Sequence, residues 1–220
     1  MAYEQTIRES RVKNALDNRK LFLTAPVPST DPEAKGKYST LQWMLVKNNP
    51  RMVVWTNDPA DTGESNDYGK ISANLDTPTF VAFLDLLAEV IDKDGEQKEY
   101  IENKNFIFPG GKRSEHPVLV NTLYCGKDKE GLIWVSVVAK NRPIIKFIFG
   151  EGEFHHFFNG DGTPAPKDKV SKRYARAYIK ILYGIMEQLF VSLWIEPEKK
   201  AYGGGKPNSN SSVALDDLPF

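Results

Sequence analysis

The sequence predicts an α+β fold in which antiparallel sheets pack on helices. Two segments, 80–91 and 170–189, carry apolar residues at the three- and four-residue spacing of an amphipathic helix. Ahead of each segment lie short runs of β-branched and aromatic residues separated by turn sequences, which is typical of antiparallel strands. The 220-residue chain is 40% hydrophobic, which is enough for one sizeable domain or two small fused ones.

Composition divides the chain into three parts. Residues 1–37 form an N-terminal arm and connector, in which 4–20 is charged and helix-permissive and 25–37 is rich in proline, glycine, serine and aspartate. Residues 38–196 form the folded body, and 197–220 form a flexible linker and an acidic C-terminal tail. We expect the arm to pack on the body through a thin apolar stripe.

The first half of the body predicts a hairpin, a third strand and a helix. The predicted strands are 41–46, 52–55 and 70–75. The turn sequence Lys-Asn-Asn-Pro at 47–50 joins the first two strands. The helix begins at Asp76-Thr77-Pro78, because Asp76 or Thr77 can cap its free amides and proline suits the first helical turn. It ends near residue 94.

The second half predicts a similar order of elements. The predicted strands are 97–108, 117–125, 131–139 and 143–149. A long helix follows the turn at 160–162 and ends near Trp194, ahead of a proline. The turn at 47–50 recurs as Lys-Asn-Arg-Pro at 140–143, which indicates a duplicated β-β-β(-β)-α unit with repeats at 38–94 and 96–195. Chance similarity of two hairpins is the alternative.

The turns also predict which side chains share a face. If three residues stay unpaired in the first turn, Trp43 lies opposite Trp55 and Lys47 opposite Arg51. In the second hairpin the same turn length puts every second residue of 133–139 and of 145–149 on one face. That face is wholly apolar and is predicted to be core. Its opposite face carries Trp134, Lys140 and Lys146. Alternatively, that second face also packs against protein.

Tryptophans and basic residues on one sheet face suit single-stranded nucleic acid, because bases stack on aromatic rings and cations follow the phosphates. Lys112 and Arg113, in a glycine-rich loop, could bind a phosphate, although a solvated loop explains them equally well. The candidate nucleic-acid-binding residues are Trp43, Lys47, Arg51, Trp55, Lys112, Arg113, Trp134, Lys140 and Lys146.

Catalytic and metal-binding patterns are not expected from the sequence. No phosphate-binding loop or nucleophile elbow occurs, and the pair His155-His156 lacks partners at metal-ligand spacing. We therefore expect no enzyme, no cofactor and no metal. The single cysteine, Cys125, lies in an apolar strand pattern and fits a buried thiol in a reducing cytoplasm. No apolar run has the roughly 20 residues that a membrane span needs, so no membrane partner is expected.

The C-terminal tail carries the most specific pattern. Acidic, apolar and aromatic residues, Asp216, Asp217, Leu218, Pro219 and Phe220, follow a Gly/Ser/Asn-rich linker at 203–212. This tip resembles the C-terminal tail of bacterial single-stranded DNA-binding proteins. In that family the final phenylalanine enters an apolar pocket on a replication or repair enzyme, and the carboxylates meet basic residues. An ordinary disordered terminus is the alternative.

The chain as a whole is similar in style to bacteriophage single-stranded DNA-binding proteins. The resemblance implies DNA replication or recombination in a bacterial host cytoplasm, with the tail recruiting replication, repair or transcription proteins. For the fold, PUR- and Whirly-type single-stranded binders and an oligonucleotide-binding barrel with an inserted helix both remain open. A transcription cofactor that recruits an RNA polymerase and an adaptor without nucleic-acid affinity are the alternative functions. Formal net charge is zero, which does not exclude nucleic acid, because the segregation of charge decides that question. The sequence leaves a homo-oligomer open.

Overall fold

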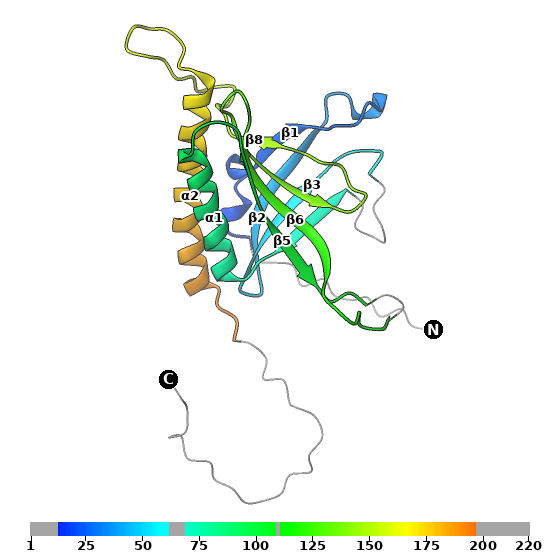
Figure 1. Cartoon of the computed structure of the whole chain (residues 1–220). Helices are drawn as coiled ribbons and strands as arrows, with labels where there is room; N and C mark the ends of the chain where they lie inside the picture. Colours follow the sequence, from blue (N-terminus) through cyan, green and yellow to red (C-terminus); the bar gives the residue numbers. More distant parts are fainter. Residues whose placement is uncertain (1–12, 62–68, 109–110, 197–220) are drawn as a thin grey trace, which may run out of the picture.

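The fold combines two four-stranded antiparallel sheets with two long helices (Figure 1). It is seen in a computed structural model that describes residues 13–61, 69–108 and 111–196. The predicted α+β class with antiparallel sheets and helices is confirmed. The sheets form no closed barrel within these ranges, so the alternative of an oligonucleotide-binding barrel is wrong for the described chain.

Each sheet consists of four consecutive strands and is followed by a helix. Sheet 1 runs in the order β1 (Leu23–Pro26), β2 (Tyr38–Val46), β3 (Asn49–Trp55) and β4 (Lys70–Asn74), and α1 (Thr77–Asp92) follows it. Sheet 2 runs in the order β5 (Gln97–Asn105), β6 (Val118–Lys127), β7 (Ile133–Ala139) and β8 (Phe147–Ile148), and α2 (Lys167–Ser192) follows it. The same order of elements therefore occurs twice.

The N-terminal region differs from its prediction. In place of an extended helix, two short 3₁₀ turns, η1 (Ala15–Asp17) and η2 (Arg19–Leu21), precede β1, while residues 1–12 lie outside the described ranges. Asn14 and Asn18 each accept a backbone hydrogen bond at the start of one turn, which favours capped single turns over a continuous helix. The expected connector contains β1 and a third short turn, η3 (Pro32–Ala34).

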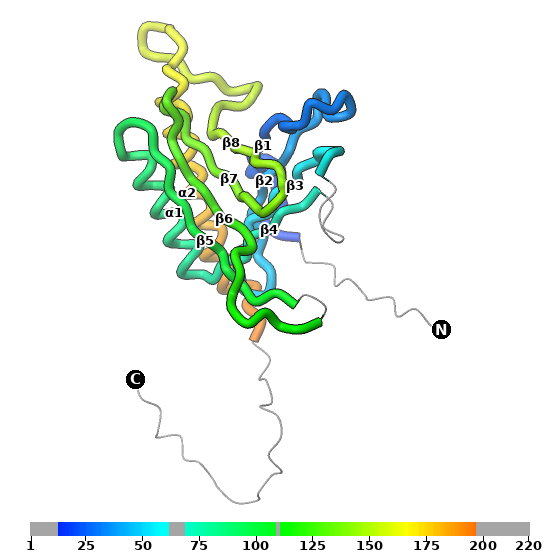
Figure 2. The backbone as a smooth tube through the Cα atoms, turned by 45° about the vertical axis from the view of Figure 1, so that its right-hand side comes forward, coloured from blue at the N-terminus to red at the C-terminus, as the bar shows by residue number. Residues whose placement is uncertain are grey.

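The two helices begin and pack as their sequences dictate. Asp76 caps α1, because its side chain accepts a hydrogen bond from the Thr79 amide at 2.7 Å and Pro78 occupies the first turn. In the tube view of Figure 2, α1 and α2 run side by side. The apolar stripe of α1 packs against β3, β5 and β6, and that of α2 packs against β7.

A single continuous core lies between the inner sheet faces and the helices. Trp43 meets Phe80 of α1 edge-on at 5.0 Å between ring centroids, and Phe149 meets Tyr178 of α2 at 5.3 Å. Such aromatic pairs add roughly 0.5–1.5 kcal/mol to the stabilisation from burial. The largest fully buried side chains are Phe80, Phe83, Phe147, Phe149, Leu41, Met52, Leu84, Leu87, Ile91, Leu123, Ile133 and Leu182.

Polar contacts join the two halves. The Asn121 amide donates to the Ser72 carbonyl at 2.9 Å and links β6 to β4. The Tyr183 hydroxyl donates to the Asp85 carboxylate at 2.7 Å and links α2 to α1. These bonds satisfy polar groups at the margins of the core, so they fix how the halves pack as well as adding stability.

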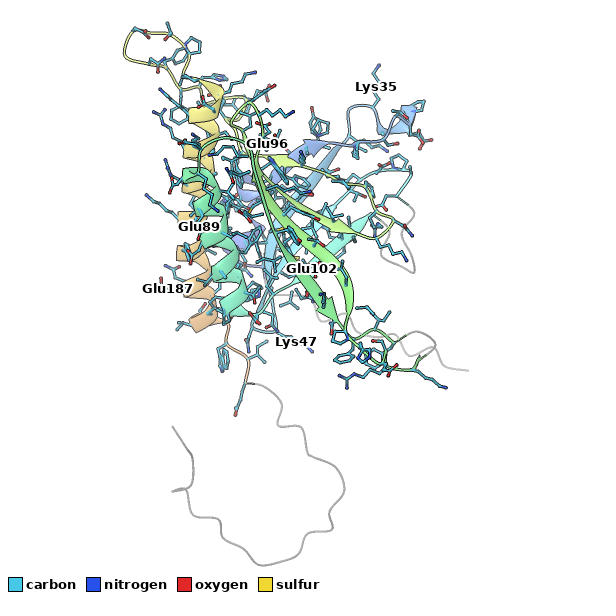
Figure 3. All side chains as sticks on the ribbon, viewed as in Figure 1. Lys35, Lys47, Glu89, Glu96, Glu102 and Glu187 are labelled. Carbon is cyan, nitrogen blue, oxygen red and sulfur yellow. The ribbon has the colours of Figure 1, made fainter. Side chains whose placement is uncertain are left out.

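The segment after α2 is held against the β2–β3 turn. The Asn48 side chain accepts a hydrogen bond from the Ile195 amide at 2.9 Å and donates one to the Ile195 carbonyl at 2.5 Å. This reciprocal pair fixes the position of Ile195 relative to the β2–β3 hairpin. Figure 3 shows Lys47 at the same end of the molecule.

Neither helix in the described part of the chain combines the length and the apolar character needed to cross a membrane.

Candidate nucleic-acid interface

The β2–β3 hairpin has a different register from the predicted one. Only Lys47 and Asn48 form its turn, with φ angles of 48° and 64°, and Val46 lies opposite Asn49. A two-residue turn with both φ values positive matches the right-handed twist of the flanking strands. Because the turn is one residue shorter than expected, the side chains of one strand change faces relative to the other.

The shorter turn separates the two tryptophans of this hairpin. Trp43 lies opposite Met52 and faces the core with 3% of its surface exposed, whereas Trp55 lies opposite Thr40 on the outer face and is 39% exposed. The prediction that Trp43 lies opposite Trp55 is therefore wrong. Trp43 contacts Phe80 and Phe83 and has no exposed ring face on which a base could stack.

The two faces of β7 are as predicted. Ile133, Val135 and Val137 are buried in the core, and Phe147 of β8 lies opposite Val135 on the same face. Trp134 lies opposite Ile148 on the outer face. The alternative prediction, that this outer face also packs against protein, holds for Trp134, which is only 5% exposed.

Three aromatic rings and two lysines gather on the outer face of sheet 2. Tyr100 lies directly opposite Tyr124 in the β5–β6 register, with 5.4 Å between their ring centroids. The Lys98 ammonium lies 4.6 Å from the centre of the Tyr124 ring, and that of Lys146 lies 4.6 Å from the centre of the Trp134 ring. We call this group the sheet-2 face: Lys98, Tyr100, Tyr124, Trp134 and Lys146.

A glycine gives Trp134 its place in the sheet. Gly126 lies opposite Trp134, and a β-carbon there would come within 2.3 Å of indole atom Cζ2. The ring therefore lies against bare backbone, and a larger residue at 126 would displace it. A groove of about 180 Å³ opens over this point and is lined by Tyr124, Trp134, Ile144 and Lys146, among others.

The rings of the sheet-2 face differ in access. Tyr100 is 56% exposed, whereas the indole of Trp134 forms the floor of the groove beneath the Lys146 side chain. Cations over aromatic faces are attracted by the ring quadrupole, so both lysines are held close to the plane on which a base would stack. The face thus offers an open aromatic platform with positive charge at its side.

A smaller group of the same kind lies on the outer face of sheet 1. Trp55 lies opposite Lys70, whose ammonium is 5.7 Å from the centre of the Trp55 ring. Tyr38 is exposed on the same face, and the Arg51 guanidinium donates a hydrogen bond to Asn74. We call this group the sheet-1 patch: Tyr38, Arg51, Trp55 and Lys70.

The other predicted basic residues do not join these groups. Lys47 is exposed in the β2–β3 turn and Lys140 is exposed just after β7. Lys112 and Arg113 lie in the loop between β5 and β6, where the Arg113 guanidinium stacks on the Phe106 ring at 3.5 Å. The predicted tail residues, Asp216, Asp217, Leu218, Pro219 and Phe220, lie outside the described ranges.

Sequence reasoning missed the tyrosines of sheet 2. The segment 97–105 alternates between half-buried and exposed side chains, and Lys98 and Tyr100 fall on its exposed positions. The usable sequence signal was that Lys98 and Tyr100 are two residues apart in a predicted strand, which places them on one face. Tyr124 had no such signal, because only the pairing of β5 with β6 brings it opposite Tyr100.

The described ranges contain no group of three or more histidine, cysteine or acidic residues placed to hold a metal ion. Burial, with a smaller contribution from the nearby Glu99 carboxylate, raises the pKa of the Cys125 thiol to about 12. This thiol therefore stays protonated at neutral pH and behaves as a small core residue.

Comparison with protein-family models, with curated proteins and with solved structures finds no match to this chain.

Proposed function

We propose that this protein binds single-stranded DNA on the outer faces of its sheets, mainly on the sheet-2 face. The observation that carries the proposal is the placement of Lys98 and Lys146 over the rings of Tyr124 and Trp134, beside the open ring of Tyr100. Aromatic platforms flanked by cations suit single strands, whose bases are free to stack while their phosphates meet positive charge.

Each part of the sheet-2 face has a separate role in this proposal. Tyr100 and Tyr124 stack with successive bases, and Lys98 contacts the backbone between them. Lys146 covers Trp134 in the free protein, so we propose that it swings to a phosphate and lets a further base reach the indole. The sheet-1 patch provides a second contact of the same chemistry along a longer strand.

The fold supports a resemblance that the sequence left open. Four antiparallel strands followed by a helix occur twice along the chain. This order is similar to that of PUR- and Whirly-type single-stranded nucleic-acid binders, in which bases lie along curved sheets. We infer that the repeat arose by internal duplication and that the outer sheet faces are the nucleic-acid surface.

The tail extends the proposal to partner recruitment. The acidic tip that ends in Phe220 resembles the partner-binding tail of bacterial single-stranded DNA-binding proteins. Ile195, close to the end of the described ranges, is held at the β2–β3 turn by Asn48. We propose a role in DNA replication or recombination, with the tail binding a replication protein while the sheets hold the strand.

The proposal is tested by removing the two tyrosine rings. Loss of stacking costs roughly 1–3 kcal/mol per base, so Tyr100→Ala and Tyr124→Ala should each weaken binding to labelled oligo-dT by about 5- to 150-fold. Fluorescence polarisation at one fixed salt concentration measures the change. Far-ultraviolet circular dichroism and the thermal midpoint establish that each variant is folded.

Phe154→Ala is the matched control, because Phe154 is also an exposed aromatic residue but lies in the loop after β8. We expect this variant to bind like the unaltered protein. If folded Tyr100→Ala and Tyr124→Ala proteins keep full affinity, the sheet-2 face is not the binding surface.

A further inference from the structure

Strand β5 is a long edge strand with one side open. It ends the order of sheet 2 and pairs only with β6, so its other edge has no neighbouring strand in the described chain. Figure 2 shows β5 at the margin of the sheet beside α1, and in Figure 3 Glu96 and Glu102 mark its course. A nine-residue edge with free backbone groups is a template for pairing with another strand.

The charges along β5 are self-complementary, and Glu102, which pairs with Lys104 of its own strand at 2.7 Å, can also meet a lysine of a second strand. In an antiparallel pair centred on Tyr100, Lys98 lies opposite Glu102 of the partner subunit, and Tyr100 lies opposite Tyr100 of the partner subunit. Lys98, Tyr100 and Glu102 all lie on the outer face in the β5–β6 register. The two-fold axis repeats the charge pair, so one such interface contains two opposite-charge pairs around a central tyrosine pair.

Other registers are disfavoured by the same residues. A two-fold axis perpendicular to the sheet places the outer faces of both subunits on the same side. Because side chains alternate between faces along a strand, the pairing of the two β5 strands can then shift only by two residues at a time. One step places Lys98 opposite Lys104 of the partner subunit. The opposite step places Glu99 opposite Glu99 of the partner subunit. Like charges directly opposite each other on neighbouring strands are destabilising.

We propose that two copies of this chain pair through β5 to form a continuous eight-stranded sheet. The occupant of the open edge is a second copy because the charges of β5 match their own reversed order. The consequence for binding rests on the proposed function. The two sheet-2 faces meet at the tyrosine pair, so a single strand of DNA would pass from one subunit to the other over one aromatic surface.

The test reverses one charge at a time and measures mass by sedimentation velocity without DNA over a wide concentration range. The unaltered protein should dimerise. Lys98→Glu and Glu102→Lys each turn both cross-strand pairs into like-charge pairs, so each should raise the dimer dissociation constant by about tenfold or more. Mixing these two variants should restore dimerisation, because an introduced glutamate then faces an introduced lysine.

Lys129→Glu and Glu130→Lys are matched controls with the same changes in net charge, placed in the exposed turn between β6 and β7. They should dimerise like the unaltered protein. The proposal is overturned by a protein that stays monomeric, by single variants that dimerise normally, or by a mixture that does not recover. Because DNA is absent, none of these outcomes depends on whether the protein binds it.

Discussion

Asp61 and Arg142 form a buried ion pair that joins loops from the two halves of the chain. Arg142 Nε and Nη2 donate to the two Asp61 carboxylate oxygens at 2.6 and 2.7 Å, and the Thr56 hydroxyl donates to the same carboxylate at 2.6 Å. The two side chains of the ion pair are only 2% and 11% exposed. Burial raises the pKa of Asp61, but the hydrogen bonds and the Arg142 charge outweigh it and leave the pKa below its ordinary value.

This pair predicts a stability difference that depends on pH. A carboxylate whose pKa is lowered by folding stabilises the fold at pH values above the ordinary aspartate pKa. This stabilisation is lost as pH falls through the pKa of the folded state. Asp61→Asn removes the carboxylate charge to which Arg142 and Thr56 donate, so it should reduce the free energy of unfolding by about 1.5–3 kcal/mol at neutral pH. The difference from the unaltered protein should shrink below about pH 4.

Urea unfolding at neutral and acidic pH, followed by tryptophan fluorescence, measures this difference. Asp128→Asn is not a suitable control, because Asp128 accepts backbone hydrogen bonds in its turn. The exposed Glu130 accepts no hydrogen bond among the described residues, so Glu130→Gln is the better control. It should change the free energy of unfolding by less than about 0.5 kcal/mol. An Asp61→Asn deficit that is constant with pH would contradict the account.

Single residues also show where sequence reasoning reached its limit. The outer position of Trp134 followed from strand alternation, but the inward position of Trp43 depended on the turn length. The predicted turn left three residues unpaired, yet Pro50 sits inside β3 opposite Leu45. Asn48 and Lys47 adopt positive φ angles, which no local pattern of the chain required. One residue of turn length therefore decided which aromatic ring reaches solvent.

At the scale of elements, a lysine side chain of β6 caps the C-terminal end of α1. The Lys127 ammonium donates to the carbonyl of Ile91 at 3.1 Å and to that of Lys93, where the helix leaves its last carbonyls unpaired. Burial lowers the pKa of Lys127, and the nearby charge of Lys172 lowers it further. A cation at this end also interacts favourably with the helix dipole.

If Lys127 caps α1, removing its ammonium group should destabilise the fold. Lys127→Met keeps most of the aliphatic stem but leaves the helix carbonyls unpaired, so it should lower the free energy of unfolding by about 1–3 kcal/mol. Urea denaturation gives the value. Lys129→Met, two residues further on and exposed, should cost under about 0.5 kcal/mol. Equal stability of the two variants would show that Lys127 is not a cap.

The elements themselves were predictable where their patterns were strong. The apolar stripe and the cap of α1, the strand at β4 and the alternation in β7 all appear as expected, because local spacing determines them. β1 was missed, since Leu23–Pro26 is a four-residue strand that pairs, among the described strands, with β2 alone. Its existence depends on a long-range pairing that the residues of the segment do not encode.

At the scale of the whole molecule, the two strand-strand-strand-strand-helix halves share one core and leave two outer sheet faces uncovered by either helix. Four of the predicted basic residues, Lys47, Lys112, Arg113 and Lys140, lie in turns and loops, whereas Arg51 and Lys146 lie with aromatic rings on those faces. That gathering needs the pairing of β5, β6 and β7, so only the assembled sheet reveals the sheet-2 face. The C-terminal tail, outside the described ranges, stays a prediction from its resemblance.

The measurement that tests the central claim most directly is a fluorescence-polarisation titration with labelled oligo-dT and a matched duplex, each at low and moderate salt. We expect tighter binding to the single strand and an affinity that falls as salt rises, because phosphate contacts release counterions. Binding to neither nucleic acid, or equal binding to single strand and duplex, would contradict the assignment of the sheet faces to single-stranded DNA.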